Sequence, residues 1–181
     1  MPPKSSSRSS VQIFFGLVGY LLLCLVVAQI GAHAVVHHVY WYSRLVKPQF
    51  TPPDGVFIPV WTIFYGLMAV AAWIVWRAPR RRTRSKYYST YSNDDSQGAA
   101  RQDALTVFYI QLGLGLLWVE MFFHFHRMLV SSVVILALWF AIIFTIFLFW
   151  RVRPIAASLL LPCLALITYA IALNLAFLRL N

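Results

Sequence analysis

The sequence predicts an all-α integral membrane protein, a bundle of five transmembrane helices. Hydrophobic residues make up 61% of the 181 residues, mean hydropathy is +0.73, and only 11% of residues are charged, against about 25% in soluble domains. Apolar runs of 21 residues or more match the roughly 30 Å hydrocarbon core of a bilayer. We expect helices at residues 11–36, 56–76, 104–125, 130–150 and 155–178.

A proline-broken loop separates the first two predicted helices. Residues 1–10 are polar and basic, so we expect them to be disordered. Pro48, Pro52 and Pro53 lack amide donors and exclude a regular helix through this part of the loop. In the second helix, Trp61 and Tyr65 are four residues apart and share a face. That face is either an interfacial aromatic belt or one wall of an aromatic pocket.

Residues 77–103 form a long polar segment before the third helix. They contain seven Lys or Arg and three Asp, are rich in Ser, Thr and Tyr, and lack aliphatic periodicity, so we expect a disordered loop. The last three helices are joined by short links, which makes neighbouring helices antiparallel. Pro162 lies inside the fifth helix and is expected to kink it.

The net charge of +10 is better explained by membrane orientation than by nucleic-acid binding. Eleven Lys or Arg fall on the side of the N-terminus and of residues 77–103, and four fall on the other side. The positive-inside rule places the richer side in the cytosol, although the orientation can reverse in a mitochondrial outer membrane. The expected partner is therefore a lipid bilayer and not a nucleic acid. Cys24 and Cys163 lie in apolar runs and are typical of small buried hydrophobic residues.

Few residues can carry chemistry. Glu120 is the one acidic residue inside a predicted span, and His124 shares its helical face. Such a carboxylate faces the bundle interior or pairs at the interface. A helical projection turns His126 away from both, so we expect no metal site. His33 and His37 share a face, as interfacial histidines do and as an axial haem ligand would. No catalytic motif occurs, and no catalytic residue is assigned.

The string from Lys47 to Tyr65 reads K-P-x-F-x-P-P-x-x-x-F-x-P-V-W-x-x-x-Y. It resembles the signature of the translocator protein family, also called peripheral benzodiazepine receptors or tryptophan-rich sensory proteins. Further matches follow in order: Trp41-Tyr42, Gln111-Leu112-x-Leu114 with Trp118, and Pro162 followed by Leu173-Asn174. The resemblance covers about residues 40–181.

The resemblance implies a five-helix bundle, often a homodimer, that binds porphyrins or haem, cholesterol and benzodiazepine-type compounds. A tetrapyrrole or sterol is thus the expected ligand, and no cofactor is expected to be required beyond a bound porphyrin or haem as ligand. Carried over by motif position, the ligand-binding residues are Tyr42, Pro52, Trp61, Tyr65, Gly115, Trp118, Phe122, Leu166, Ala170 and Asn174.

The chain departs from the family pattern at several of these positions. Gly115 stands where the family has Asn, and Glu120 stands where it has Pro. In the fifth helix, Cys163 replaces a Tyr of the family's sterol-recognition segment. Leu166 replaces the Trp to which porphyrin breakdown is linked in some members. The polar segment 77–103 is also longer than usual.

We therefore expect a membrane protein that binds tetrapyrroles or sterols in an aromatic pocket, as a translocator, scavenger or sensor. Tryptophan, tyrosine and few charges suit a flat, weakly polar ligand held by stacking and dispersion. One alternative is a light- or oxygen-dependent porphyrin-degrading enzyme, and another is an interaction scaffold that uses residues 77–103. The mitochondrial outer membrane and the ER or secretory membranes both remain open as locations.

Overall fold

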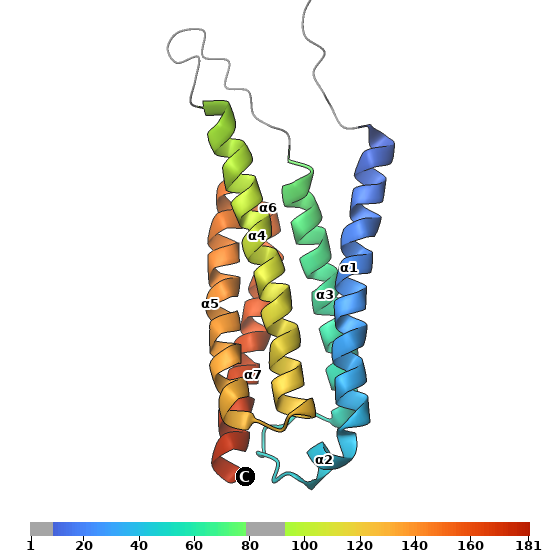
Figure 1. Cartoon of the computed structure of the whole chain (residues 1–181), viewed down its shortest axis with the longest axis vertical. Coiled ribbons are helices and arrows are strands. Elements are labelled where there is room, and N and C mark those ends of the chain that lie inside the picture. The colour runs from blue at the N-terminus through green and yellow to red at the C-terminus, as the bar shows by residue number, and fades with distance from the viewer. Residues whose placement is uncertain (1–8, 79–92) are drawn as a thin grey trace, which may run out of the picture.

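Five long helices run up and down in the computed structural model, which describes residues 9–78 and 93–181 (Figure 1). They are α1 (Ser10–His37), α3 (Phe57–Trp76), α4 (Asn93–Val119), α5 (Met128–Val152) and α7 (Leu161–Leu180). Between them lie α2 (Val39–Arg44), the 3-10 turn η1 (Asp54–Val56), the π-helical turn η2 (Glu120–His124) and α6 (Pro154–Ser158). Within the described residues, five helical segments are long and apolar enough to cross a membrane, which confirms the predicted all-α membrane bundle.

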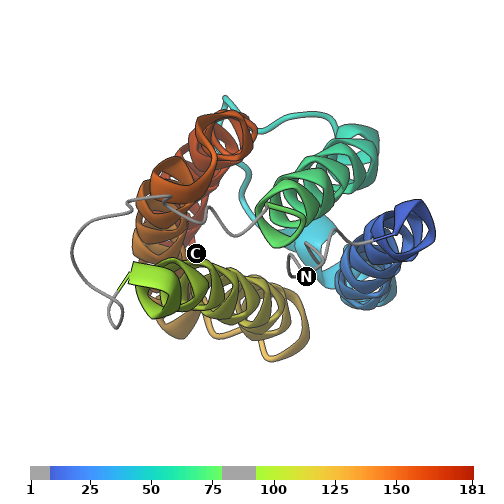
Figure 2. The same ribbon diagram turned by 90° about the horizontal axis from the view of Figure 1, so that it is seen from above.

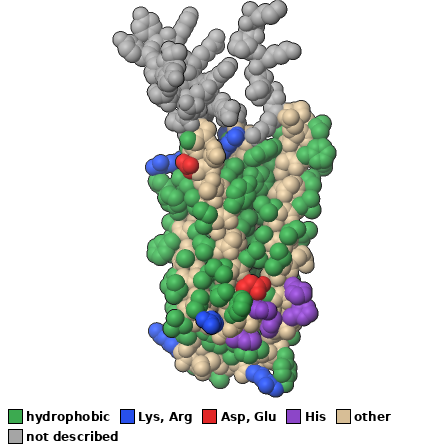
Figure 3. Space-filling view, viewed as in Figure 1, with side chains coloured by type: hydrophobic (Ala, Val, Ile, Leu, Met, Phe, Trp, Pro, Cys, Tyr) green, Lys and Arg blue, Asp and Glu red, His purple; other side chains and the backbone are tan. Residues whose placement is uncertain are grey.

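The helices form a closed ring when viewed along the bundle (Figure 2). Helix α1 packs beside α3 and α4, α5 packs beside α4 and α7, and α3 reaches α6. Ala69, Ala71 and Ala72 of α3 are fully buried, and these small side chains allow neighbouring helices to approach α3 closely. Gly16 of α1 lies against Trp76, because a Cβ atom at Gly16 would stand only 2.3 Å from that ring. The outer surface between the two ends is apolar (Figure 3), as lipid contact requires.

Helices α1, α4, α5 and α6 begin earlier than the sequence predicts, by one, eleven, two and one residues. Helix α1 starts at Ser10 because Ser9 and Gln12 form a reciprocal capping box. Helix α4 starts at Asn93, within the segment expected to be a loop. Residues 98–103 include good helix formers, and Arg101 Nη1 donates to the Trp76 backbone oxygen at 3.3 Å, which joins α4 to the end of α3. The prediction of a disordered loop is therefore wrong for residues 93–103, whereas residues 1–8 and 79–92 lie outside the described residues.

The predicted fifth helix is interrupted rather than continuous. Helix α6 ends at Ser158, and α7 begins at Leu161 with Pro162 in its first turn. The proline ring would collide with the carbonyl group of residue 158 in an unbroken helix, and it has no amide to donate. The buried Leu160 amide instead bonds to the Ala157 oxygen at 3.0 Å, so its backbone N–H is satisfied.

Helix α4 ends in the π-helical turn η2 instead of continuing to residue 125 as a regular helix. The Phe125 amide bonds to the Glu120 oxygen at 3.0 Å, five residues back. The wider turn brings the adjacent rings of Phe122 and Phe123 into the core, where each is 4% exposed. His126 follows with φ of 55°, a left-handed conformation that reverses the chain toward α5.

The proline loop crosses the end of the bundle between α2 and α3 (Figure 1). Helix α7 holds it at two places. The Tyr169 hydroxyl donates to the Phe50 oxygen at 2.6 Å. The Asn181 carboxamide accepts from the Val46 amide at 2.9 Å and donates to the Val46 oxygen at 3.3 Å. These bonds fix the loop that leads into the aromatic start of α3.

A buried polar cluster joins α5 to α7. Asn174 is 2% exposed, and its Oδ1 accepts from the hydroxyls of Ser132 at 2.7 Å and Ser131 at 3.3 Å. Its Nδ2 donates to Ser131 Oγ at 3.1 Å. Each serine Oγ also lies 2.8 Å from the Met128 oxygen, so the one proton of each hydroxyl is shared between this oxygen and Asn174 Oδ1. The amide of Asn174 is thus engaged between helices, where hydrogen bonds carry helix association in lipid.

We expect Ser132→Ala to destabilise the protein by about 1 kcal/mol, because it removes an interhelical bond in an apolar interior. Ser158→Ala is the matched control, since its hydroxyl is exposed and bonds to the Ile155 oxygen of its own helix. The control should change stability by less than about 0.5 kcal/mol. Unfolding in mixed micelles with increasing SDS measures both, and equal effects would contradict the interhelical role.

Candidate ligand pocket

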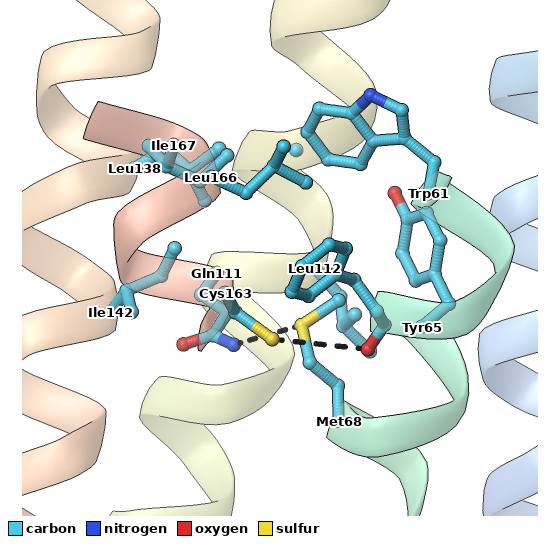
Figure 4. Close-up of a pocket in the computed structure, with 12 residues that line it drawn as sticks. Trp61, Tyr65, Met68, Gln111, Leu112, Leu138, Ile142, Cys163, Leu166 and Ile167 are labelled. Atoms are coloured by element: carbon cyan, nitrogen blue, oxygen red, sulfur yellow. Dashed lines mark hydrogen bonds between the residues drawn. The ribbon is translucent and has the colours of Figure 1, made fainter. Parts of the chain in front are cut away.

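An internal cavity lies between α3, α4, α5 and α7 (Figure 4). Its volume is about 30 Å³. No lining residue is charged, and the lining is hydrocarbon apart from one amide, one phenol, one indole, one thiol and one thioether. The lining residues are Trp61, Phe64, Tyr65, Met68, Gln111, Leu112, Gly115, Leu138, Ile142, Cys163, Leu166 and Ile167.

Two indole rings form one end of this region. The ring centroids of Trp61 and Trp118 lie 5.5 Å apart with planes tilted by 32°. Tyr65, one turn after Trp61 on α3, has its ring centroid 6.3 Å from the Trp61 ring. Trp118 is 4% exposed and belongs to the core. The predicted shared face of Trp61 and Tyr65 is confirmed, and it turns inward rather than forming an aromatic belt against lipid.

Two buried polar atoms in this region have no hydrogen-bond partner in the described structure: Gln111 Oε1 and Trp118 Nε1. Gln111 is 1% exposed, and its Nε2 donates only weakly, to Met68 Sδ at 3.4 Å (Figure 4). An unpaired buried acceptor or donor costs about 1–3 kcal/mol. The cavity lining therefore offers one unpaired acceptor, Gln111 Oε1, and the neighbouring core holds one unpaired donor, Trp118 Nε1.

Four of the ten residues expected from the family pattern line the cavity: Trp61, Tyr65, Gly115 and Leu166. Gly115 leaves the space beside Tyr65, whose hydroxyl oxygen would lie 3.7 Å from a Cβ atom there. Trp118 packs against Trp61 without lining the cavity itself.

The other five residues lie elsewhere in the bundle. Tyr42 and Phe122 belong to an aromatic cluster toward the loop end, with ring centroids 5.5 Å and 5.8 Å from Phe177. Ala170 is buried in the same core. Asn174 is held by the serines of α5, and Pro52 is half-buried in the proline loop.

The residues predicted from the sequence include neither of the α5 lining residues, Leu138 and Ile142, and omit Met68 and Gln111. Gln111 carried a detectable signal, because an amide inside an apolar span usually faces the bundle interior. Met68 follows Tyr65 by three residues and so shares its face. Leu138 and Ile142 gave no signal, since α5 is apolar around its circumference and its inward face is set by packing against neighbours.

The cavity is much smaller than an organic ligand. A single water needs on the order of 10–15 Å³ of such volume, so the described conformation has room for about two. A tetrapyrrole or sterol enters only when the side chains around the cavity move apart. Trp61, Phe64 and Leu166 are half-buried, whereas the other lining residues are buried.

We expect Gln111→Leu to stabilise the protein by about 1 kcal/mol, because it removes a buried carbonyl oxygen that has no donor. Gln102→Leu is the control, as the same change on an exposed position of the same helix. It should alter stability by less than about 0.5 kcal/mol. Unfolding in SDS mixed micelles measures both changes. A loss of stability in Gln111→Leu would show that the native amide is satisfied.

Comparison with known proteins agrees with this architecture. The model of the TspO/MBR family matches residues 20–180. The tryptophan-rich protein TspO of Archaeoglobus fulgidus is 34% identical over 166 residues, covering 91% of this chain and 96% of its own. The protein of the same name from Chlorobaculum tepidum is 35% identical over 162 residues, covering 88% and 91%. The human translocator protein is 29% identical over 134 residues, covering 74% and 70%. The chain is therefore a multi-pass membrane protein that belongs to the TspO/MBR family.

Proposed function

We propose that this protein binds a flat, largely apolar ligand in the cavity lined by Trp61, against which Trp118 packs, and that it acts as a membrane translocator, scavenger or sensor for that ligand. A tetrapyrrole is the first candidate, and a sterol is the second. The observation that carries the proposal is the pair of indole rings, 5.5 Å apart, beside an uncharged cavity.

The chemistry of the cavity supports binding by stacking and dispersion. Aromatic rings attract flat π-systems at centroid separations of about 4.5–7 Å, so an indole pair can accept a planar ring against either face once the rings separate. The absence of charge among the lining residues favours a ligand with an apolar body. A tetrapyrrole offers the larger stacking area, since a sterol has no aromatic face.

The two unpartnered polar atoms set a second requirement. A porphyrin has pyrrole N–H donors for Gln111 Oε1 and acceptor nitrogens or carboxylates for Trp118 Nε1. A sterol hydroxyl supplies a donor and an acceptor at a single point. Both ligand classes can therefore form hydrogen bonds with Gln111 Oε1 and Trp118 Nε1. They differ in the area that can stack on the indole rings.

The names of relatives support transport or sensing rather than turnover. The human relative is called translocator protein, and a relative from Cereibacter sphaeroides is called tryptophan-rich sensory protein. The cavity lining has no carboxylate, histidine or lysine that could exchange a proton with a bound substrate. Binding with release to another site or partner is the function that this lining fits.

The proposal predicts that the indole pair reports on ligand. Protoporphyrin should quench the tryptophan fluorescence of the protein in nanodiscs, and Trp61→Leu with Trp118→Leu should weaken binding at least tenfold. Base or ring stacking of this kind is worth about 1–3 kcal/mol per aromatic side chain. Trp150→Leu is the matched control, because Trp150 is 57% exposed on the lipid-facing surface.

Porphyrin binding that survives the double change, with an unchanged dissociation constant, would remove the cavity assignment. A parallel titration with a fluorescent sterol separates the two ligand classes. Sterol binding that depends on both tryptophans, together with no porphyrin binding, would replace the tetrapyrrole by the sterol.

A second prediction uses the space at Gly115. Gly115→Leu should fill the cavity and reduce porphyrin affinity at least tenfold while the bundle stays folded, because the added atoms project beside Tyr65. Gly113→Leu is the control on the exposed side of the same helix, where a Cβ atom meets nothing within 4 Å. Isothermal titration in nanodiscs measures both. Equal affinity for the two variants would place the ligand elsewhere.

A further inference from the structure

All five histidines of the chain gather at one end of the bundle (Figure 3). His33 and His37 lie near the end of α1, and His38 is the residue after it. His124 ends η2, and His126 lies two residues further on. A second cavity of about 510 Å³ lies here, lined by His33, Ala34, His37, His38, Glu120 and His124. It shares no lining residue with the aromatic cavity.

The backbone explains why His126 joins this group although a helical projection turns it away. Helical structure ends at His124, and His126 has the left-handed φ of 55°. Its ring lies against Trp41 with centroids 4.0 Å apart. Left-handed backbone at a residue other than glycine is uncommon and concentrates at functional positions.

His38 lies between the other two imidazoles. Its ring centroid is 5.0 Å from that of His124 and 5.7 Å from that of His126. Two imidazoles that bind one tetrahedral ion through nitrogen at about 2.0–2.1 Å place their ring centroids roughly 5 Å apart. The spacing therefore matches that of histidines sharing a metal ion.

The hydrogen bonding of His38 suits the same role. Its Nδ1 lies 2.9 Å from the Ala34 backbone oxygen. A carbonyl oxygen only accepts, so Nδ1 carries the proton, and Nε2 of the neutral ring keeps its lone pair. Histidines that bind metals commonly donate the other ring N–H to a carbonyl or carboxylate in this way. Glu120 adds the one carboxylate to the cavity wall, which favours a cation.

We propose that His38, His124 and His126 form a binding site for a divalent transition-metal ion, with Glu120 supplying negative charge beside it. Imidazole nitrogen is a favoured ligand for Zn²⁺, Cu²⁺ and Ni²⁺. Among the described residues, no three such side chains already surround one point. His124 and His126 are exposed, and binding an ion requires the His126 ring to leave Trp41 and turn toward His38.

Co²⁺ is the probe, because its complexes with imidazole absorb visible light, and Zn²⁺ then serves as the competitor. The full chain is purified without a polyhistidine tag and placed in phosphatidylcholine nanodiscs. We expect one Co²⁺ per chain, displaced by Zn²⁺. His38→Gln and His124→Gln should each weaken binding at least tenfold. His33→Gln, on the same cavity wall but outside the trio, should stay within about twofold.

The absence of saturable Co²⁺ binding by the parent would overturn the proposal. Binding that is lost in His33→Gln and kept in His38→Gln would also overturn it, and would place the ion on the His33–His37 pair of α1. Protoporphyrin titration of the same variants should match the parent, because the two cavities are separate. A failure of the metal-site proposal therefore appears in the Co²⁺ titration, and a failure of the proposed aromatic pocket appears in the protoporphyrin titration.

Discussion

The need to satisfy every backbone amide and carbonyl inside lipid governs this bundle. Helices meet that need along their length, so interruptions are tolerated only where other groups supply the bonds. At the break before Pro162, the Leu160 amide bonds to the Ala157 oxygen, and Leu160 is buried in protein and does not face lipid. The π-helical turn at Glu120–His124 retains a bond from Phe125 to Glu120. Both irregular segments are therefore compatible with an apolar environment.

Helix packing then decides where space remains. Alanines of α3 bring that helix close to its neighbours toward the end where α4 begins, and Phe108 and Phe149 fill the centre there without exposure. Further along, α3 presents Trp61 and Tyr65 toward α4, and α4 presents Gly115. A glycine opposite a tyrosine leaves a gap that alanine-rich packing would close. The cavity thus arises from a change of side-chain size along a pair of helices, with no change in backbone geometry.

The number of helices and the aromatic face of α3 were predictable from hydropathy and four-residue spacing. The early start of α4 was hidden because polar helix formers carry no apolar period, and the π turn was hidden because a regular projection assumes 3.6 residues per turn. Leu138 and Ile142 were not predictable as lining, since α5 is apolar all round. Asn174 shows the limit of motif transfer: the position was recognised, but its bonds to Ser131 and Ser132 exist only in the folded bundle.

The π turn η2 contributes residues both to the core and to the cavity that the histidines line. This segment turns Phe122 and Phe123 into the core and places His124 on the outer cavity, and the left-handed conformation of His126 after it brings that ring beside His38. A substitution in this segment therefore disturbs core packing and the histidines together. Trp61 on α3 and His38 at the end of α1 each belong to one region alone. Substitutions at Trp61 and at His38 can therefore test the aromatic cavity and the histidine cluster separately. Substitutions in η2 cannot, because that segment contributes to the core and to the histidine cluster.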